Sequence, residues 1–240
     1  MHRLVRSLAA SLALALVAAL LWLVARGPAR VRPLESPGPA AALAQGSVAM
    51  AVQRSAPAVV GVTAVTASAV PGGGLLLTAQ GSGFVVDPRG GILTSASLVR
   101  GAQRIVVRLH RGRTLAAVGV RLDRRRDVAL LEVRPGGRLP ALSLGSASAP
   151  PAGTYVVSLG GAGATLGVVS SGARGVAVAG GRPLALLQTD APLLRGNVGG
   201  PLLDLTGRVV GMATFSISGG QGIGFAVPAK EIRAALKDLT

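Results

Sequence analysis

The chain has 240 residues, of which 50% are apolar and 2% aromatic, and it contains 35 Gly and 15 Pro, a composition that excludes wholesale disorder and favours many short strands over a helical bundle. The absence of Cys and the presence of only two His exclude disulfides, a thiolate nucleophile and a histidine zinc site within the domain, and we expect no cofactor. Twenty-five basic residues against nine acidic ones give a net charge of +16, which favours anionic partners.

The N-terminal segment, residues 1–26, is predicted to be a membrane anchor. Residues 8–25 carry no charge, and at about 1.5 Å per residue they are just long enough for one transmembrane helix. Arg3, Arg6 and Arg26 flank this run. A cleaved signal peptide is the alternative, but its small-residue cleavage site would lie unusually far beyond the apolar run. We therefore favour an uncleaved anchor.

The next segment, residues 27–45, is rich in Pro and Ala and is predicted to be an extended linker. A short helix is expected over 46–56. A first set of apolar, β-branched runs follows, over 59–66, 83–87, 104–110, 114–121 and 127–133, and the turn at Asp87–Gly91 is a strong hairpin signal.

A Pro- and Gly-rich stretch at 135–153 separates this set from a second one. The second set covers 154–160, 165–170, 174–179, 184–189, 201–205, 208–215 and 222–227, and residues 228–239 have the apolar spacing of a terminal helix. Two strand sets with a break between them predict an all-β fold of two small barrels, which we place at 46–140 and 141–240.

Four segments, taken together, resemble the trypsin-like serine peptidases of the HtrA/Deg type. They are QGSGF at 80–84 with GILTSASLV at 91–99, RDVALLEV at 126–133, QTDA at 188–191 with GNVGGPLL at 196–203, and GIGFAVP at 222–228. The resemblance covers about residues 46–240. It implies two six-stranded β-barrels with a site in the cleft between them, and no PDZ domain follows the terminal helix in this sequence.

The resemblance also implies a catalytic triad at three positions. The acid position is retained as Asp127, but Ser97 occupies the histidine position and Val198 the position of the serine nucleophile. Valine has no nucleophilic atom, and a serine hydroxyl does not accept protons near neutral pH as an imidazole does. The resemblance therefore predicts a proteolytically inactive member of the family.

The turn around the nucleophile position is retained. The family's oxyanion-hole amides correspond to Gly196 and Val198, and the turn scaffold to Asn197, Gly199 and Gly200. One interpretation is a cleft that still binds extended peptide by strand addition beside residues 208–216. The other is that the Gly-rich turn only closes the second barrel.

A basic cluster within residues 100–126 is the remaining feature. Its functional interpretation is a patch for acidic lipid headgroups or an acidic partner, and its alternative is a solvated barrel face. Nucleic acid is a poor candidate because aromatic stacking residues are scarce. The patch residues are Arg104, Arg108, Arg111, Arg113, Arg124, Arg125 and Arg126.

The combined hypothesis is a membrane-anchored, HtrA-like pseudopeptidase that binds an extended peptide or protein ligand outside the cytoplasm, or is secreted if the signal is cleaved. Two alternatives stay open: a serine endopeptidase that is active by another route, and a basic surface binder of anionic lipid or polymer. Proteolysis by the purified protein distinguishes the first alternative, and salt-sensitive vesicle binding the second.

Overall fold

A computed structural model describes residues 39–70, 73–146, 148–176, 183–216 and 223–240. Contacts between Cα atoms divide the chain after Ala42, and the unit from Leu43 to Thr240 holds all the strands. Within the described ranges, no helix is long and apolar enough to cross a bilayer. The predicted anchor over residues 8–25 lies outside these ranges.

The first barrel is closed, with the strand order β1-β2-β3-β6-β5-β4, and every pairing is antiparallel. Its interior holds aliphatic side chains such as Val62, Ile92, Val107 and Leu131. The strands are β1 (Val59–Val70), β2 (Gly73–Asp87), β3 (Gly91–Ser95), β4 (Arg104–Arg108), β5 (Thr114–Asp123) and β6 (Val128–Val133).

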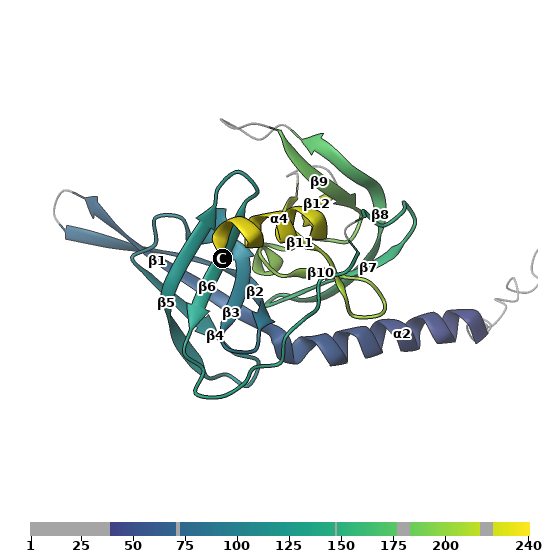
Figure 1. Cartoon of the computed structure of the whole chain (residues 1–240), viewed down its shortest axis with the longest axis horizontal. Coiled ribbons are helices and arrows are strands. Elements are labelled where there is room, and N and C mark those ends of the chain that lie inside the picture. Colours follow the sequence, from purple (N-terminus) through teal and green to yellow (C-terminus); the bar gives the residue numbers. More distant parts are fainter. Residues whose placement is uncertain (1–38, 71–72, 147, 177–182, 217–222) are drawn as a thin grey trace, which may run out of the picture. The chain divides into compact units, whose positions relative to one another are not determined.

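The second barrel is also closed, in the order β10-β11-β12-β9-β8-β7 (Figure 1). The prediction of two six-stranded barrels is thereby confirmed. The strands are β7 (Tyr155–Gly160), β8 (Gly163–Val176), β9 (Leu184–Thr189), β10 (Pro201–Leu203), β11 (Val209–Ser216) and β12 (Gly224–Pro228).

Helix α2 (Pro39–Ser55) begins earlier than expected, inside the segment predicted to be an extended linker. The sequence after Pro39 explains the difference, because proline is favoured in the first turn of a helix and the alanines that follow are the strongest helix formers. A 3₁₀ turn, η1 (Ala56–Ala58), connects α2 to β1.

The limits of the predicted strands were wrong in two places. The run at 165–170 and residues 174–176 of the next run belong to one strand, β8, which continues through bulges beside Ser171, and the rest of the predicted run at 174–179 lies outside the described residues. Strand β2 begins at Gly73, ten residues before the predicted start, because its first half pairs residue by residue with β1. Local propensity did not predict this half, since the partner strand supplies the hydrogen bonds.

Helix α4 (Ala229–Leu239) confirms the predicted terminal helix and contacts strands of both barrels. Ile232 and Ala235 on its inner face are fully buried in a cluster with Phe84 and Leu130 of the first barrel and Met212 of the second. This cluster therefore joins the two barrels and α4, in addition to the clusters inside each barrel. This core fixes the ends of β3 and β6 relative to the turn before β10.

Candidate active site

Asp127 lies in the turn that leads into β6, and its backbone φ is +55°, the one positive φ outside glycine among the described residues. Its carboxylate accepts hydrogen bonds from the Ser97 amide at 2.7 Å and from Ser95 Oγ at 2.7 Å. The Asp127 carbonyl accepts one from the Ala96 amide at 3.2 Å. The aspartate therefore binds the first turn of the short helix α3 (Ala96–Val99), which begins where β3 ends.

Burial raises the pKa of the Asp127 carboxyl above its ordinary value, and the hydrogen bonds from Ser95 and Ser97 act in the opposite direction. Ser95 is fully buried and Ser97 is exposed, and their hydroxyl oxygens lie 2.6 Å apart. Two hydroxyls, with no imidazole, thus occupy the space beside this carboxylate. Ser97 Oγ is itself 3.4 Å from Asp127 Oδ2.

The turn that holds Val198 is bound to a strand of each barrel by backbone hydrogen bonds. The Val198 carbonyl accepts from the Ser82 amide of β2 at 2.8 Å, and the Gly199 amide donates to the Ala213 carbonyl of β11 at 2.7 Å. Gly199 has a φ of +82°, and a Cβ at this position would lie 2.9 Å from the Ser95 amide nitrogen. The acid position and the nucleophile position therefore meet at the end of β3.

Ser82 and Asn197 support this turn from inside. Ser82 Oγ donates to the Gly196 carbonyl at 2.6 Å and accepts from the Gly161 amide at 2.8 Å. The Asn197 side chain, which is fully buried, accepts from the Ala162 amide at 3.2 Å. The sequence placed Asn197 in the turn scaffold but gave Ser82 no role. The only signal for Ser82 was its place in the QGSGF segment.

The predicted oxyanion-hole amides belong to this turn, within which η2 (Arg195–Asn197) forms a short 3₁₀ helix. The Val198 amide donates to the Arg195 carbonyl at 3.3 Å. An anion bound at this amide would have to displace that carbonyl. The Val198 side chain is partly exposed and contains no nucleophilic atom.

A hollow of about 300 Å³ opens beside Gly196, between the two barrels. Its lining includes Thr63 and Gln80 of the first barrel, Ala162 of the second, and the guanidinium-bearing Arg108 of β4. A ligand that reaches the turn at 195–200 can therefore contact both barrels.

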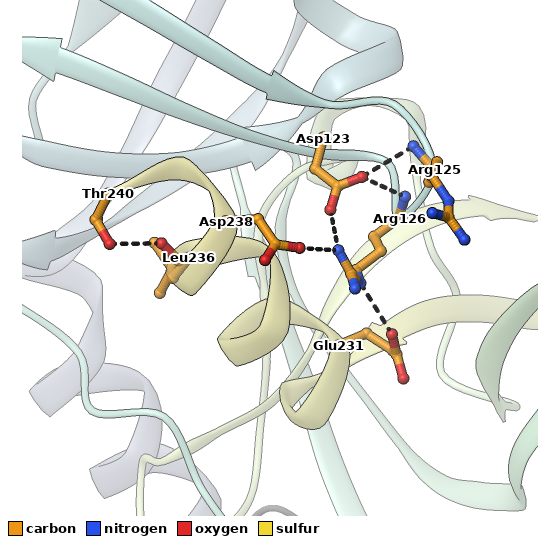
Figure 2. Close-up of polar contacts among 7 residues, drawn as sticks. All are labelled: Asp123, Arg125, Arg126, Glu231, Leu236, Asp238 and Thr240. Carbon is orange, nitrogen blue, oxygen red and sulfur yellow. Dashed lines mark hydrogen bonds and ion pairs between the residues drawn. The ribbon is translucent and has the colours of Figure 1, made fainter.

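The residues of the predicted basic patch lie in different surroundings. Arg104, Arg108, Arg111, Arg113, Arg124 and Arg125 are exposed, and Arg113 also donates to the Pro135 carbonyl. Arg126 donates to Asp123, Asp238 and Glu231, as Figure 2 shows, and the Asp123 and Asp238 carboxylates raise its pKa. Arg126 is thus a link between the β5–β6 turn and α4, and it is not available as part of an open patch.

No group of three or more metal-ligating acidic, His or Cys residues occurs in the part of the chain that the structure describes. His110, the one histidine outside the N-terminal segment, is exposed after β4 and does not contact the Asp127 carboxylate.

The comparisons with known proteins agree with this geometry. A family model described as a trypsin-like peptidase domain matches residues 81–212. Serine protease HTRA4 of Mus musculus is 38% identical over 168 residues, which are 67% of this chain and 34% of that protein. Serine protease HTRA1 of Xenopus laevis is 38% identical over 162 residues, 65% of this chain and 35% of that protein.

A solved structure of the HtrA-type protease AlgW, carrying a serine-to-alanine substitution and determined with a decapeptide, superposes with a TM-score of 0.73. Its sequence is 28% identical, and the match covers 80% of this chain and 66% of that one. The chain spans about a third of the length of these two curated relatives.

Proposed function

We propose that this chain, which belongs to the trypsin-like peptidase family, is an HtrA-like pseudopeptidase. Such a protein binds extended peptides in its cleft without cleaving them. The reason is that Ser97 and Val198 stand where the family resemblance places histidine and the serine nucleophile. We further propose that residues 1–26 anchor it to a membrane and that the barrels lie outside the cytoplasm.

The observation that carries this proposal is the hydrogen bonding around Asp127. In the triad mechanism the aspartate accepts a hydrogen bond from the histidine that activates the nucleophile. Here its two carboxylate oxygens accept from the Ser97 amide and the Ser95 hydroxyl, at 2.7 Å each. In this proposal the acid has a structural role in place of the catalytic one.

The edge of β11 supports peptide binding. Its pairing with β10 ends at Met212, whereas its pairing with β12 continues to Ser216. Residues 214–216 therefore have a β-strand neighbour on one side only, among the strands that the structure describes. An extended peptide can add to such an edge through backbone hydrogen bonds. This edge follows directly after Ala213, which binds Gly199 of the candidate site.

The test restores the missing groups in the full chain, purified in a nonionic detergent because of its apolar N-terminal run. We expect the natural protein to leave casein intact and the Ser97→His/Val198→Ser variant to cleave it. Adding Asp127→Asn to that variant should abolish the cleavage, because the imidazole then loses its acceptor. This third protein also controls for a contaminating protease.

Cleavage by the natural protein, at a rate that Asp127→Asn does not change, would overturn the proposal in favour of an endopeptidase with another nucleophile. Binding is measured separately, as fluorescence anisotropy of labelled apolar peptides on the natural protein. Absence of any peptide binding would also contradict the proposal and leave the turn at 195–200 with a purely structural role.

A further inference from the structure

Three hollows on the surface adjoin one another and lead away from the candidate site. The first is the 300 Å³ hollow beside Gly196. The second, of about 230 Å³, shares Gly61, Arg108 and Gly161 with it. The third, of about 450 Å³, shares Leu109 and His110 with the second. We call these three hollows the basic track, because they form a series that starts between the barrels and ends on the first barrel.

The charge along the basic track has one sign. Its described lining contains Arg108, Arg111, Arg113 and Arg138 and no Asp or Glu. None of these arginines takes part in an ion pair within the described ranges. Arg108 lies over Gly61, with its guanidinium nitrogens 3.6 Å from the position a Cβ would take there.

Within the described part of the chain, no acidic side chain near the third hollow is free to pair with its arginines. Asp87, the acid that Arg138 influences, is already bound by the Arg89 guanidinium at 2.8 Å. Arg113 is held against the Pro135 carbonyl, which fixes the position of its guanidinium group. Arg111 and Arg138 are exposed, so an arriving carboxylate can reach both.

The floor of the third hollow is apolar. Val85 is buried there, and Leu109, Leu139 and three prolines are the other apolar residues of the lining. A ligand that fits this hollow therefore combines an acidic group, which pairs with guanidinium, and an adjacent apolar side chain. A series of concave hollows suits an extended chain, whereas a flat bilayer surface would contact only their rims.

We propose that the basic track binds an acidic and apolar extension of the same peptide whose other part occupies the cleft. This inference rests on the proposed function and names its ligand class: an extended peptide with carboxylates on the side that leaves the cleft past Arg108. The Arg111 and Arg138 guanidinium groups are the binding groups of the third hollow, and Leu109 and Leu139 receive the apolar residue.

The experiment compares three labelled peptides on the full chain in nonionic detergent: a neutral apolar peptide, and the same peptide with four alternating Glu and Leu residues added at one end or at the other. We expect one of the two extensions to tighten binding roughly tenfold at about 0.05 M salt, because each exposed guanidinium–carboxylate pair contributes a factor of about 1.4 to 5. The gain should fall at 0.3 M salt.

Two double variants test which arginines produce the gain in affinity of the extended peptide. Arg111→Ser/Arg138→Ser should remove it and leave the affinity for the neutral peptide unchanged. Arg104→Ser/Arg208→Ser removes the same charge from exposed positions outside the basic track and should retain the gain. An equal loss in both variants would overturn the inference, because the effect would then come from the overall charge of +16.

The remaining outcomes separate the two proposals. If the acidic peptide binds through Arg111 and Arg138 but the neutral peptide does not bind at all, the basic track binds acidic peptide by itself, and peptide binding in the cleft, with the continuity between cleft and track, is refuted. If neither peptide binds, both fail. If vesicles containing phosphatidylglycerol lose binding to Arg111→Ser/Arg138→Ser while the peptide gain persists, the track contacts lipid and the inference is refuted.

Discussion

The substitution Gly199→Ala tests whether the turn at the nucleophile position is packed as tightly as the structure indicates. Gly199 has a φ of +82°, in the left-handed region, which costs a residue with a Cβ about 1–2 kcal/mol. The added methyl would also press against Thr94 Oγ1 and the Ser82 carbonyl. These two atoms hydrogen-bond to each other at 2.6 Å, so neither can move without breaking that bond.

Gly112→Ala is the matched control. Gly112 has a φ of +87°, and nothing lies within 4 Å of the position its Cβ would take. Both variants therefore carry the backbone cost, and only Gly199→Ala carries the cost of overpacking, which is about 1–3 kcal/mol. We expect Gly199→Ala to lower the free energy of unfolding by about 1–3 kcal/mol more than Gly112→Ala does.

The assay is urea unfolding of the full chain, followed by circular dichroism of the strands. The two variants are compared at equal denaturant slope, since a changed slope would indicate an altered unfolded state. If the two unfolding free energies agree within about 0.5 kcal/mol, the turn is not enclosed by Thr94 and Ser82, and the packing argument for the site is refuted.

Two further predictions concern charged groups. Burial raises the pKa of Asp127 on folding, so ionisation of its carboxyl group opposes folding. The natural protein therefore loses stability as pH rises from about 4 through the folded pKa. Over this pH range Asp127→Asn should become more stable relative to the natural protein. Urea unfolding at pH 4 and pH 7 measures this shift, and a shift of the opposite sign would contradict the assignment. Arg126→Met should lower the free energy of unfolding by about 1–3 kcal/mol, because it leaves Asp123, whose side chain is 8% exposed, without its cation. Arg121→Met is the control: it removes a half-exposed ion pair, which contributes under about 1 kcal/mol. Equal unfolding free energies for these two variants would show that the Arg126 contacts do not stabilise the fold.

The strands with alternating or continuous apolar runs could be predicted from the sequence, because their own residues carry the signal. Strand β6 is an example: five of its six residues are buried, and the prediction placed it within one residue. The start of β2 could not be predicted, because Gly73 and Gly74 are poor strand formers. Their strand conformation comes from pairing with Val70 and Ala69 of β1.

In the candidate site, too, some features could be predicted from the sequence and others could not. The positions of Asp127 and Val198 followed from short motifs. The hydrogen bond between Ser95 and Asp127 did not, because it joins residues that are 32 apart in the chain and meet only when β3 pairs with β6. Likewise, the patch residue Arg126 gave no sequence signal that Glu231 and Asp238 would surround it.

The link between Arg126 and α4 bears on the order in which the protein folds during synthesis. Glu231 lies 105 residues after Arg126, and at about 5–20 residues per second the ribosome needs roughly 5–20 seconds to add that stretch. The strands of the first barrel are complete long before then, but Leu130 and Phe84 cannot pack against the inner face of α4 until that helix is synthesised. A nascent chain therefore exposes this apolar surface for seconds, with Arg126 paired to Asp123 but not yet to Glu231 and Asp238, and in this interval it is most exposed to aggregation.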